Sequence, residues 1–325
     1  MRLVFRHAAL LVGAAMLLCA PSATRAQGAY PDHPVRVLVP YPPGGGADTV
    51  ARILFTRLGE HWGQSFVIDN RPGGSGTIAA GALVRAAPDG YTLMHDATAH
   101  SVNPSLFASQ PYDTNRDFAA IFLAVRVSNL LVLNNQVQAK TVADVIALAK
   151  ATPGGLDWAS SGNGGAQHLA LELFRQLAGI TLNHIPYKGG GPVLNDLIAG
   201  QVKYYFSNAT ASTQMVKAGS IKAIAHTGIG RLTSLPELPP VADTLPGYEC
   251  YEWNGIFAPA ATPRPIIDKL NAGLNAVIGE PDIAKRLAEL NAETRPNTPE
   301  EARAFVNAEI AKWTKVVREG NIKIE

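Results

Sequence analysis

The sequence has little cysteine and few charges, and both shortages limit what the protein can be. Its 325 residues include two cysteines, Cys19 and Cys250, and only 17% charged residues. If Cys19 leaves with an N-terminal signal, no disulfide can form within the chain, so the core must supply the stability. A lone cysteine such as Cys250 is typical of a small buried hydrophobe. No basic cluster is present, which argues against a nucleic-acid partner.

Long apolar runs are absent except at the N-terminus. Arg2 and Arg6 precede the apolar run 8–20, and a segment of small residues follows it. The run is too short to span a bilayer comfortably. This arrangement predicts a secretory signal peptide, 1–26, that is cleaved after Ala26.

A lipoprotein signal ending at Cys19 is the alternative, and the bulky Leu18 just before the cysteine disfavours it. Removal of 1–26 takes away three arginines and no acid, so the net charge falls from +2 to −1. We therefore expect a near-neutral protein located in the periplasm.

Motifs of common catalytic and metal sites are also missing. The chain has no Gly-x-Ser-x-Gly, no His-x-x-x-His and no Cys-x-x-Cys, and no Gly-Lys-Ser/Thr follows its glycine runs. Ser160, Ser161 and His168 could be read with an aspartate as a hydrolase triad, but Ser161 precedes a glycine turn rather than occupying a sharp elbow. The sequence favours a protein that is not an enzyme and uses neither a cofactor nor a metal.

Short apolar runs alternate with helical patterns through the first third of the chain. Strands are predicted at 35–39, 66–68 and 91–94, and helices at 49–54 and 77–87. This β-α-β rhythm predicts an α/β fold with two mainly parallel sheets flanked by helices.

The same rhythm continues in the middle of the chain, and the C-terminal third reads as helical. Strands are predicted at 130–133, 156–159 and 221–225, and helices at 142–150 and 167–178. No repeat or low-complexity linker marks a domain boundary.

Two glycine-rich turns are the most informative features. The turn 41–48 follows the strand 35–39 and opens a helix, and the turn 160–168 stands in the same way before the helix 167–178. Such turns leave backbone N–H groups pointing outward, and the helix start adds partial positive charge. Two turns of this kind predict a small anionic ligand held from two sides.

An ordered set of short motifs surrounds these turns. It consists of Pro34-Val35-Arg36-Val37, Pro42-Pro43-Gly44-Gly45 with Asp48, Asp69-Asn70-Arg71-Pro72-Gly73, Pro88-Asp89-Gly90-Tyr91-Thr92-Leu93, Asn103-Pro104-Ser105-Leu106-Phe107, Ser161-Gly162-Asn163-Gly164, Pro186-Tyr187-Lys188-Gly189-Gly190-Gly191-Pro192, Asp196-Leu197-Ile198-Ala199-Gly200-Gln201-Val202 and Trp253-Asn254-Gly255. In this order, from about residue 30 to the C-terminus, the chain resembles the tripartite tricarboxylate transporter receptors, also called the Bug family of extracytoplasmic solute-binding proteins.

The resemblance implies a two-lobed periplasmic binding protein of the Venus-flytrap type. Lobe one would comprise 27–127 plus 250–325, and lobe two 128–249. A small carboxylate, either a di- or tricarboxylate or an aromatic acid, would lie between the lobes. The receptor, expected to be a monomer, would deliver it to a large and a small integral membrane subunit. The alternative is an extracytoplasmic sensor that presents its ligand to a membrane signalling partner.

The resemblance also places the ligand at the two turns. One carboxylate would be held by the first turn, with Tyr41, Pro43, Gly44, Gly45, Gly46 and Asp48. The far end of the ligand would meet the second turn, with Ser161, Asn163, Gly164, Ala166, Gln167 and His168. Thr98, in a third turn after a strand, and the acid Asp243 complete the expected set.

Several of these residues have a structural interpretation as well. Asp48 is read first as an acid that favours the helix dipole, His168 as a histidine bonded to a neighbouring loop, and Thr98 and Ser75 as helix caps. Members of this family often carry acids where this chain has Lys203 and Ser207. This departure favours simple carboxylates as ligands.

Overall fold

The computed structural model describes residues 30–107 and 109–322. The predicted signal peptide and Cys19 lie outside the described residues. The fold set out below is that of the compact unit that begins at His33.

Ten strands of the described chain join in the order β2-β1-β3-β9-β4-β7-β5-β6, with β8 and β10 also pairing with β4. The strands are β1 (Val35–Val39), β2 (Phe66–Asn70), β3 (Thr92–Ala97), β4 (Phe118–Leu133), β5 (Leu156–Ser160), β6 (Leu182–Pro186), β7 (Tyr204–Asn208), β8 (Lys222–His226), β9 (Tyr251–Pro259) and β10 (Ala292–Glu293).

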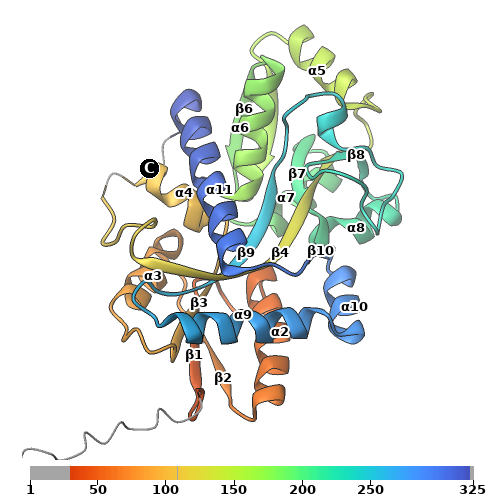
Figure 1. Cartoon of the computed structure of the whole chain (residues 1–325). Coiled ribbons are helices and arrows are strands. Elements are labelled where there is room, and N and C mark those ends of the chain that lie inside the picture. The colour runs from red at the N-terminus through yellow and green to blue at the C-terminus, as the bar shows by residue number, and fades with distance from the viewer. Residues whose placement is uncertain (1–29, 108, 323–325) are drawn as a thin grey trace, which may run out of the picture. The chain divides into compact units, whose positions relative to one another are not determined.

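The described helices cover these strands (Figure 1). They are α2 (Gly46–Trp62), α3 (Thr77–Val84), α4 (Ala99–Leu106), α5 (Val142–Ala151), α6 (Ala166–Ala178), α7 (Gly190–Ala199), α8 (Ala209–Lys217), α9 (Arg264–Ile278), α10 (Pro281–Glu289) and α11 (Pro299–Gly320), with the short 3₁₀ turns η2 (Gly74–Gly76) and η3 (Val241–Asp243).

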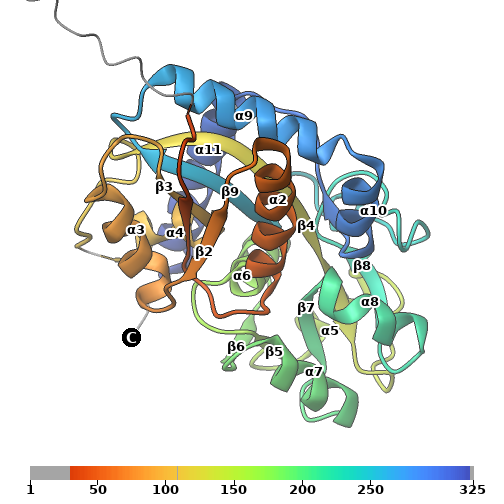
Figure 2. The ribbon, with the colours of Figure 1, turned by 90° about the horizontal axis from the view of Figure 1, so that it is seen from below.

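The predicted α/β class is confirmed, and the sheet is mixed. β1 is parallel to β2 and β3, and β5 is parallel to β6 and β7, as expected for β-α-β units. β9 and β4 run antiparallel to their neighbours and join the two parallel groups. In Figure 1, β1–β3 and α2 lie below the place where β4 and β9 cross the molecule, and β6, β7, α7 and α8 lie above it. The view from below in Figure 2 shows β5–β7 and α7 grouped together, apart from β2 and β3.

The long strand β4 carries the chain from one parallel group to the other. It pairs with β9 as far as Ser128, opposite Tyr251, and with β7 from Asn129 onward. The predicted lobe boundaries, near Val127 and Cys250, lie at this change of partner. Cys250 is free and fully buried, as expected of a small hydrophobe.

Helix α11 packs against both parallel groups. Ala302 and Val306, in its first half, join a core cluster with Leu38, Met94 and Phe257. Its second half, which includes Trp313 and Val316, joins the core of the middle segment around Trp158 and Phe174. Any rearrangement between the two groups of strands therefore has to be accommodated along α11.

Two local predictions are wrong. The helix predicted at 77–87 ends at Val84, ahead of Pro88, whose ring disfavours helical geometry in the residue before it. Ser75 does not cap this helix. It lies inside η2 with φ 51°, and Gly76 occupies the cap position with no side-chain cap bond.

Candidate functional site

The two glycine turns have the same backbone geometry. Gly44 and Gly164 adopt left-handed φ values of 81° and 72°, which suit a residue without a Cβ atom. The next residues, Gly45 and Gly165, are extended, with φ/ψ of −72°/166° and −77°/167°, and each is followed at once by a helix. The predicted second turn of the same kind is therefore present, 120 residues after the first.

Each turn is closed by a side chain from the first turn of its own helix. The N–H of Gly44 donates to Asp48 Oδ2 at 2.8 Å, and the N–H of Gly164 donates to His168 Nδ1 at 3.0 Å. The sequences share only glycines, yet both use a side-chain acceptor four residues further on. The acceptor ties the glycine of each turn to the first turn of the helix that follows.

The helix starts leave backbone donors without protein acceptors. The first intrahelical bonds are donated by Thr49 to Gly45 and by Leu169 to Gly165. Within 30–107 and 109–322, no acceptor is found for the N–H groups of the residues between, which are Gly46, Ala47 and Asp48 in α2 and Ala166, Gln167 and His168 in α6. Donors of this kind, at the positive end of the helix dipole, suit an anion.

Asp48 is a structural part of the first turn. It is 2% exposed, and besides Gly44 it accepts hydrogen bonds from Arg52 Nε at 2.9 Å and Asn70 Nδ2 at 2.8 Å. Burial alone would raise the pKa of this carboxyl, but these donors outweigh it and lower the pKa below its ordinary value. The carboxylate is thus occupied by the turn and its neighbours.

Tyr41 and Thr98 likewise make contacts within the protein. The hydroxyl of Tyr41 donates to Asp96 Oδ1 at 3.1 Å. Burial, first of all, and then the nearby carboxylates raise the pKa of Tyr41 well above its ordinary value. Thr98 is 3% exposed, and its hydroxyl lies between Tyr251 O and the N–H of Trp253, at 3.5 and 3.3 Å. It makes no side-chain cap bond to α4.

The second turn is tied to β9 by a chain of polar side chains. Ser161 Oγ donates to Gln167 Oε1 at 2.7 Å. Gln167 Nε2 reaches Asn129 Oδ1 at 3.2 Å and Glu252 Oε2 at 3.5 Å. The same Glu252 oxygen accepts from Asn208 Nδ2 at 2.7 Å. Glu252 therefore connects the second turn to the start of α8.

A cavity of about 220 Å³ lies between the first turn and the start of α8. Its wall includes Gly44, Gly46, Thr49, Asn208, Thr210 and Glu252. Among its lining residues Glu252 is the one ionisable group. The second turn does not line this cavity and reaches it through the Gln167–Glu252 contact.

The remaining predicted residues lie outside this cavity. Pro43 borders a separate hollow, which is also lined by Gly44, Asp48, Arg52 and Arg286. Asn163 is exposed. Asp243 is exposed in η3, where its N–H donates to Pro240 O.

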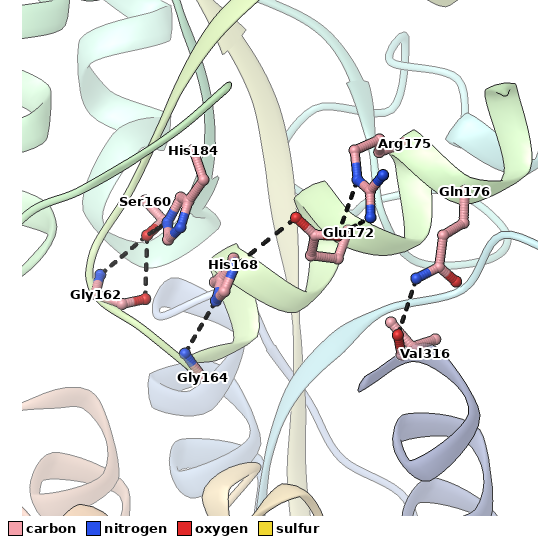
Figure 3. Close-up of polar contacts among 9 residues, drawn as sticks. All are labelled: Ser160, Gly162, Gly164, His168, Glu172, Arg175, Gln176, His184 and Val316. Carbon is pink, nitrogen blue, oxygen red and sulfur yellow. Dashed lines mark hydrogen bonds and ion pairs between the residues drawn. The ribbon is translucent and has the colours of Figure 1, made fainter. Parts of the chain in front are cut away.

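Behind the second turn, His168 stacks on His184 (Figure 3), with ring centroids 3.8 Å apart. Ser160 Oγ lies 2.6 Å from His184 Nε2, the contact that a nucleophile and base would make. However, Ser160 is fully buried, so a substrate could not reach it. His184 is not among the residues predicted from the sequence. We interpret the contacts among Ser160, His168 and His184 as structural support for the second turn.

Burial gives this histidine pair a low affinity for protons. It lowers the pKa of His168 to about 3, helped by the positive charges that His184 and Arg175 would place nearby, and it lowers the pKa of His184 to about 4. The Nδ1 atom of His168 must also stay unprotonated to accept from Gly164. Both rings are neutral at pH 7.

We therefore expect acid to destabilise the protein through these rings. A group with a lowered pKa in the folded state contributes stability above its ordinary value of about 6.5, and this is lost as pH falls toward the folded value. At pH 5 each ring should lower the free energy of unfolding by about 2 kcal/mol relative to pH 7. Chemical denaturation at pH 7 and pH 5 measures this loss. Between the two pH values, the free energy of unfolding of His168→Gln should fall by about 2 kcal/mol less than that of the wild-type protein.

The control for this experiment is Leu177→Gln, at an exposed position of the same helix. It should keep the full pH effect. An unchanged pH effect in His168→Gln would contradict the burial argument.

The described residues contain no group of three or more histidine, cysteine or acidic side chains that could hold a metal ion. They also contain no helix long and apolar enough to cross a bilayer.

The fold is that of solved periplasmic solute-binding proteins. The structure "R. palustris Rpa4515 with adipate" aligns with a TM-score of 0.80 and 37% identity, over 90% of this chain and 99% of that one. MatC (Rpa3494) from Rhodopseudomonas palustris with bound malate aligns with a TM-score of 0.76 and 31% identity, over 89% and 100% of the two chains.

The sequence profile described as "Tripartite tricarboxylate transporter family receptor" matches residues 50–322. Protein BugT of Bordetella pertussis is 33% identical, over 91% of this chain and 92% of its own length. The chain belongs to the tripartite tricarboxylate transporter receptor family, which confirms the resemblance read from its motifs.

Proposed function

We propose that this protein is a periplasmic receptor that captures a small carboxylate and delivers it to the large and small membrane subunits of a tripartite transporter. The observation that carries the proposal is the pair of equivalent turns, each presenting N–H donors without protein acceptors at a helix start. Two relatives in the same fold have adipate and malate bound, which supports a carboxylate as the ligand.

In this proposal the ligand is held mainly by the main chain. The cavity that contains Glu252 has no lysine or arginine in its wall, so a carboxylate there would depend on the N–H groups of α2 and on bridging water. Such contacts need not be weak. The distal end of the ligand would meet the second turn, near Gln167. No cofactor is required.

The proposed motion is closure of two lobes over the ligand. Lobe one would comprise 27–127 with 250–325, and lobe two 128–249. The two crossing strands, β4 and β9, would act as the hinge because β4 changes its partners at Ser128 and Asn129. Since α11 packs on both groups of strands, it would limit the amplitude of closure.

A thermal-shift screen of carboxylates tests this proposal. Succinate, adipate, citrate and benzoate would be compared with uncharged partners such as adipamide and benzamide. At one hundred times the dissociation constant, a bound carboxylate should stabilise the folded protein by about 2.7 kcal/mol. A shift with at least one carboxylate, and none with its amide, is the expected result; equal shifts, or none with any carboxylate, would overturn the proposal.

A further inference from the structure

The acid in the candidate cavity is unexpected for a receptor of anions. Glu252 lies on β9 and lines the cavity together with Gly44 and Gly46 of the first turn. A ligand carboxylate bound at the start of α2 would share this space with a second carboxylate. Like charges in one site repel each other, so the ligand has to offset that repulsion.

One oxygen of Glu252 is already committed to the protein. Oε2 accepts hydrogen bonds from Asn208 and, at longer range, from Gln167. In the part of the chain that the structure describes, no hydrogen bond to Oε1 is found. Glu252 is partly exposed, at the cavity wall. The side chain is therefore fixed by one oxygen while the other can accept a donor from a ligand.

We propose that Glu252 selects, among small carboxylates, those that also carry a hydrogen-bond donor, namely a hydroxyl or an ammonium group. This inference rests on the proposed function and makes its ligand class narrower. The ligand's carboxylate meets the N–H groups of α2, and its donor meets Glu252. A simple carboxylate brings no donor and leaves Glu252 Oε1 without a hydrogen bond. Because an unpaired polar group in a binding site costs free energy, the site should bind ligands without a donor much more weakly.

The proposal differs from what the sequence suggests. Lys203 and Ser207 stand where relatives often have acids, and that departure favours simple carboxylates. In the structure Ser207 is fully buried, and the acid in the cavity comes from β9. Burial raises the pKa of Glu252, whereas the donors Asn208 and Gln167 lower it. The two amide donors offset only part of this rise, so the pKa of Glu252 stays above its ordinary value. A ligand donor at Oε1 would favour the ionised form further.

Matched ligand pairs test the proposal by calorimetry. Succinate would be compared with malate and aspartate, adipate with 2-hydroxyadipate and 2-aminoadipate, and benzoate with 4-hydroxybenzoate. The wild-type protein should bind the donor-bearing member of at least one pair about tenfold or more tightly. In Glu252→Gln that preference should vanish or reverse, because the uncharged amide no longer repels a simple carboxylate.

Two further variants complete the test. Glu237→Gln, at an exposed acid outside the cavity, should keep the wild-type preference. Glu252→Asp retains the charge and should keep the direction of the preference at lower affinity. Glu252→Asp can also replace Glu252→Gln if that variant does not fold. The comparison of ligand pairs on the wild-type protein needs no variant.

The outcomes separate this inference from the proposed function. Carboxylate binding without preference in the wild-type protein, or a preference that survives in Glu252→Gln, would overturn the inference and leave the receptor function standing. If no carboxylate in the panel binds the wild-type protein, the proposed function fails and the inference fails with it.

Discussion

Replacing Gly46 by leucine is expected to weaken carboxylate binding at least about 100-fold while the protein stays folded. Gly46 lines the cavity, and a Cβ atom placed on it would meet nothing within 4 Å. A leucine there would project into open space at the mouth of the first turn and occupy the position of the ligand. Because leucine also restricts the unfolded chain and favours helices, stability should rise slightly, by about 0.5 kcal/mol.

Gly191→Leu is the matched control. Gly191 is also near a helix start, is exposed, and has nothing within 4 Å of an added Cβ atom, but it does not line the cavity. It should bind the same carboxylate as tightly as the wild-type protein. Wild-type affinity in Gly46→Leu, measured by calorimetry, would show that the ligand does not use the first turn.

Replacing Asp48 by alanine should lower the free energy of unfolding by about 2–3 kcal/mol and weaken ligand binding as well. The change leaves Gly44 N–H, Arg52 and Asn70 without their shared acceptor. Arg52 is half exposed, so water recovers part of the loss. The turn loses the bond that fixes Gly44, and the donors of α2 should then be less well placed.

Asp48→Asn distinguishes this role from a simple dipole effect. Asparagine keeps one oxygen acceptor, so we expect about half the loss of stability. An acid that only favours a helix dipole is worth about 0.3–1 kcal/mol. If urea denaturation places Asp48→Ala within that smaller range, the turn does not depend on the carboxylate.

Much of the fold could be predicted from the sequence because its signals are local. Strands such as β1 and β5 are short, mostly apolar runs, and each is followed by a glycine-rich turn that leads into a helix. The mixed topology of the sheet could not be predicted from such local signals. β4 is 16 residues long, and the sequence analysis predicts only its last four residues as a strand. Its antiparallel pairing with β9 and β7 could not be predicted, because nothing local in a sequence says which strands pair across the chain.

The candidate site was predicted in outline and missed in detail. The glycines of both turns could be found because their spacing is visible, whereas the equivalence of Asp48 and His168 could not, because an aspartate and a histidine share no pattern until both are seen to accept from a glycine N–H. Glu252 is not among the predicted residues because the sequence analysis predicts no strand at 251–259, where β9 places this acid among buried residues.

The most direct test of the account is amide NMR of the ¹⁵N-labelled protein, with whichever carboxylate gives the largest thermal shift. The account predicts that the N–H signals of both helix starts move together on binding and that their exchange with solvent slows. The signals concerned are those of Gly46, Ala47 and Asp48 in α2 and of Ala166, Gln167 and His168 in α6. Movement at only one helix start, or at neither, would contradict a ligand held from both sides by the main chain.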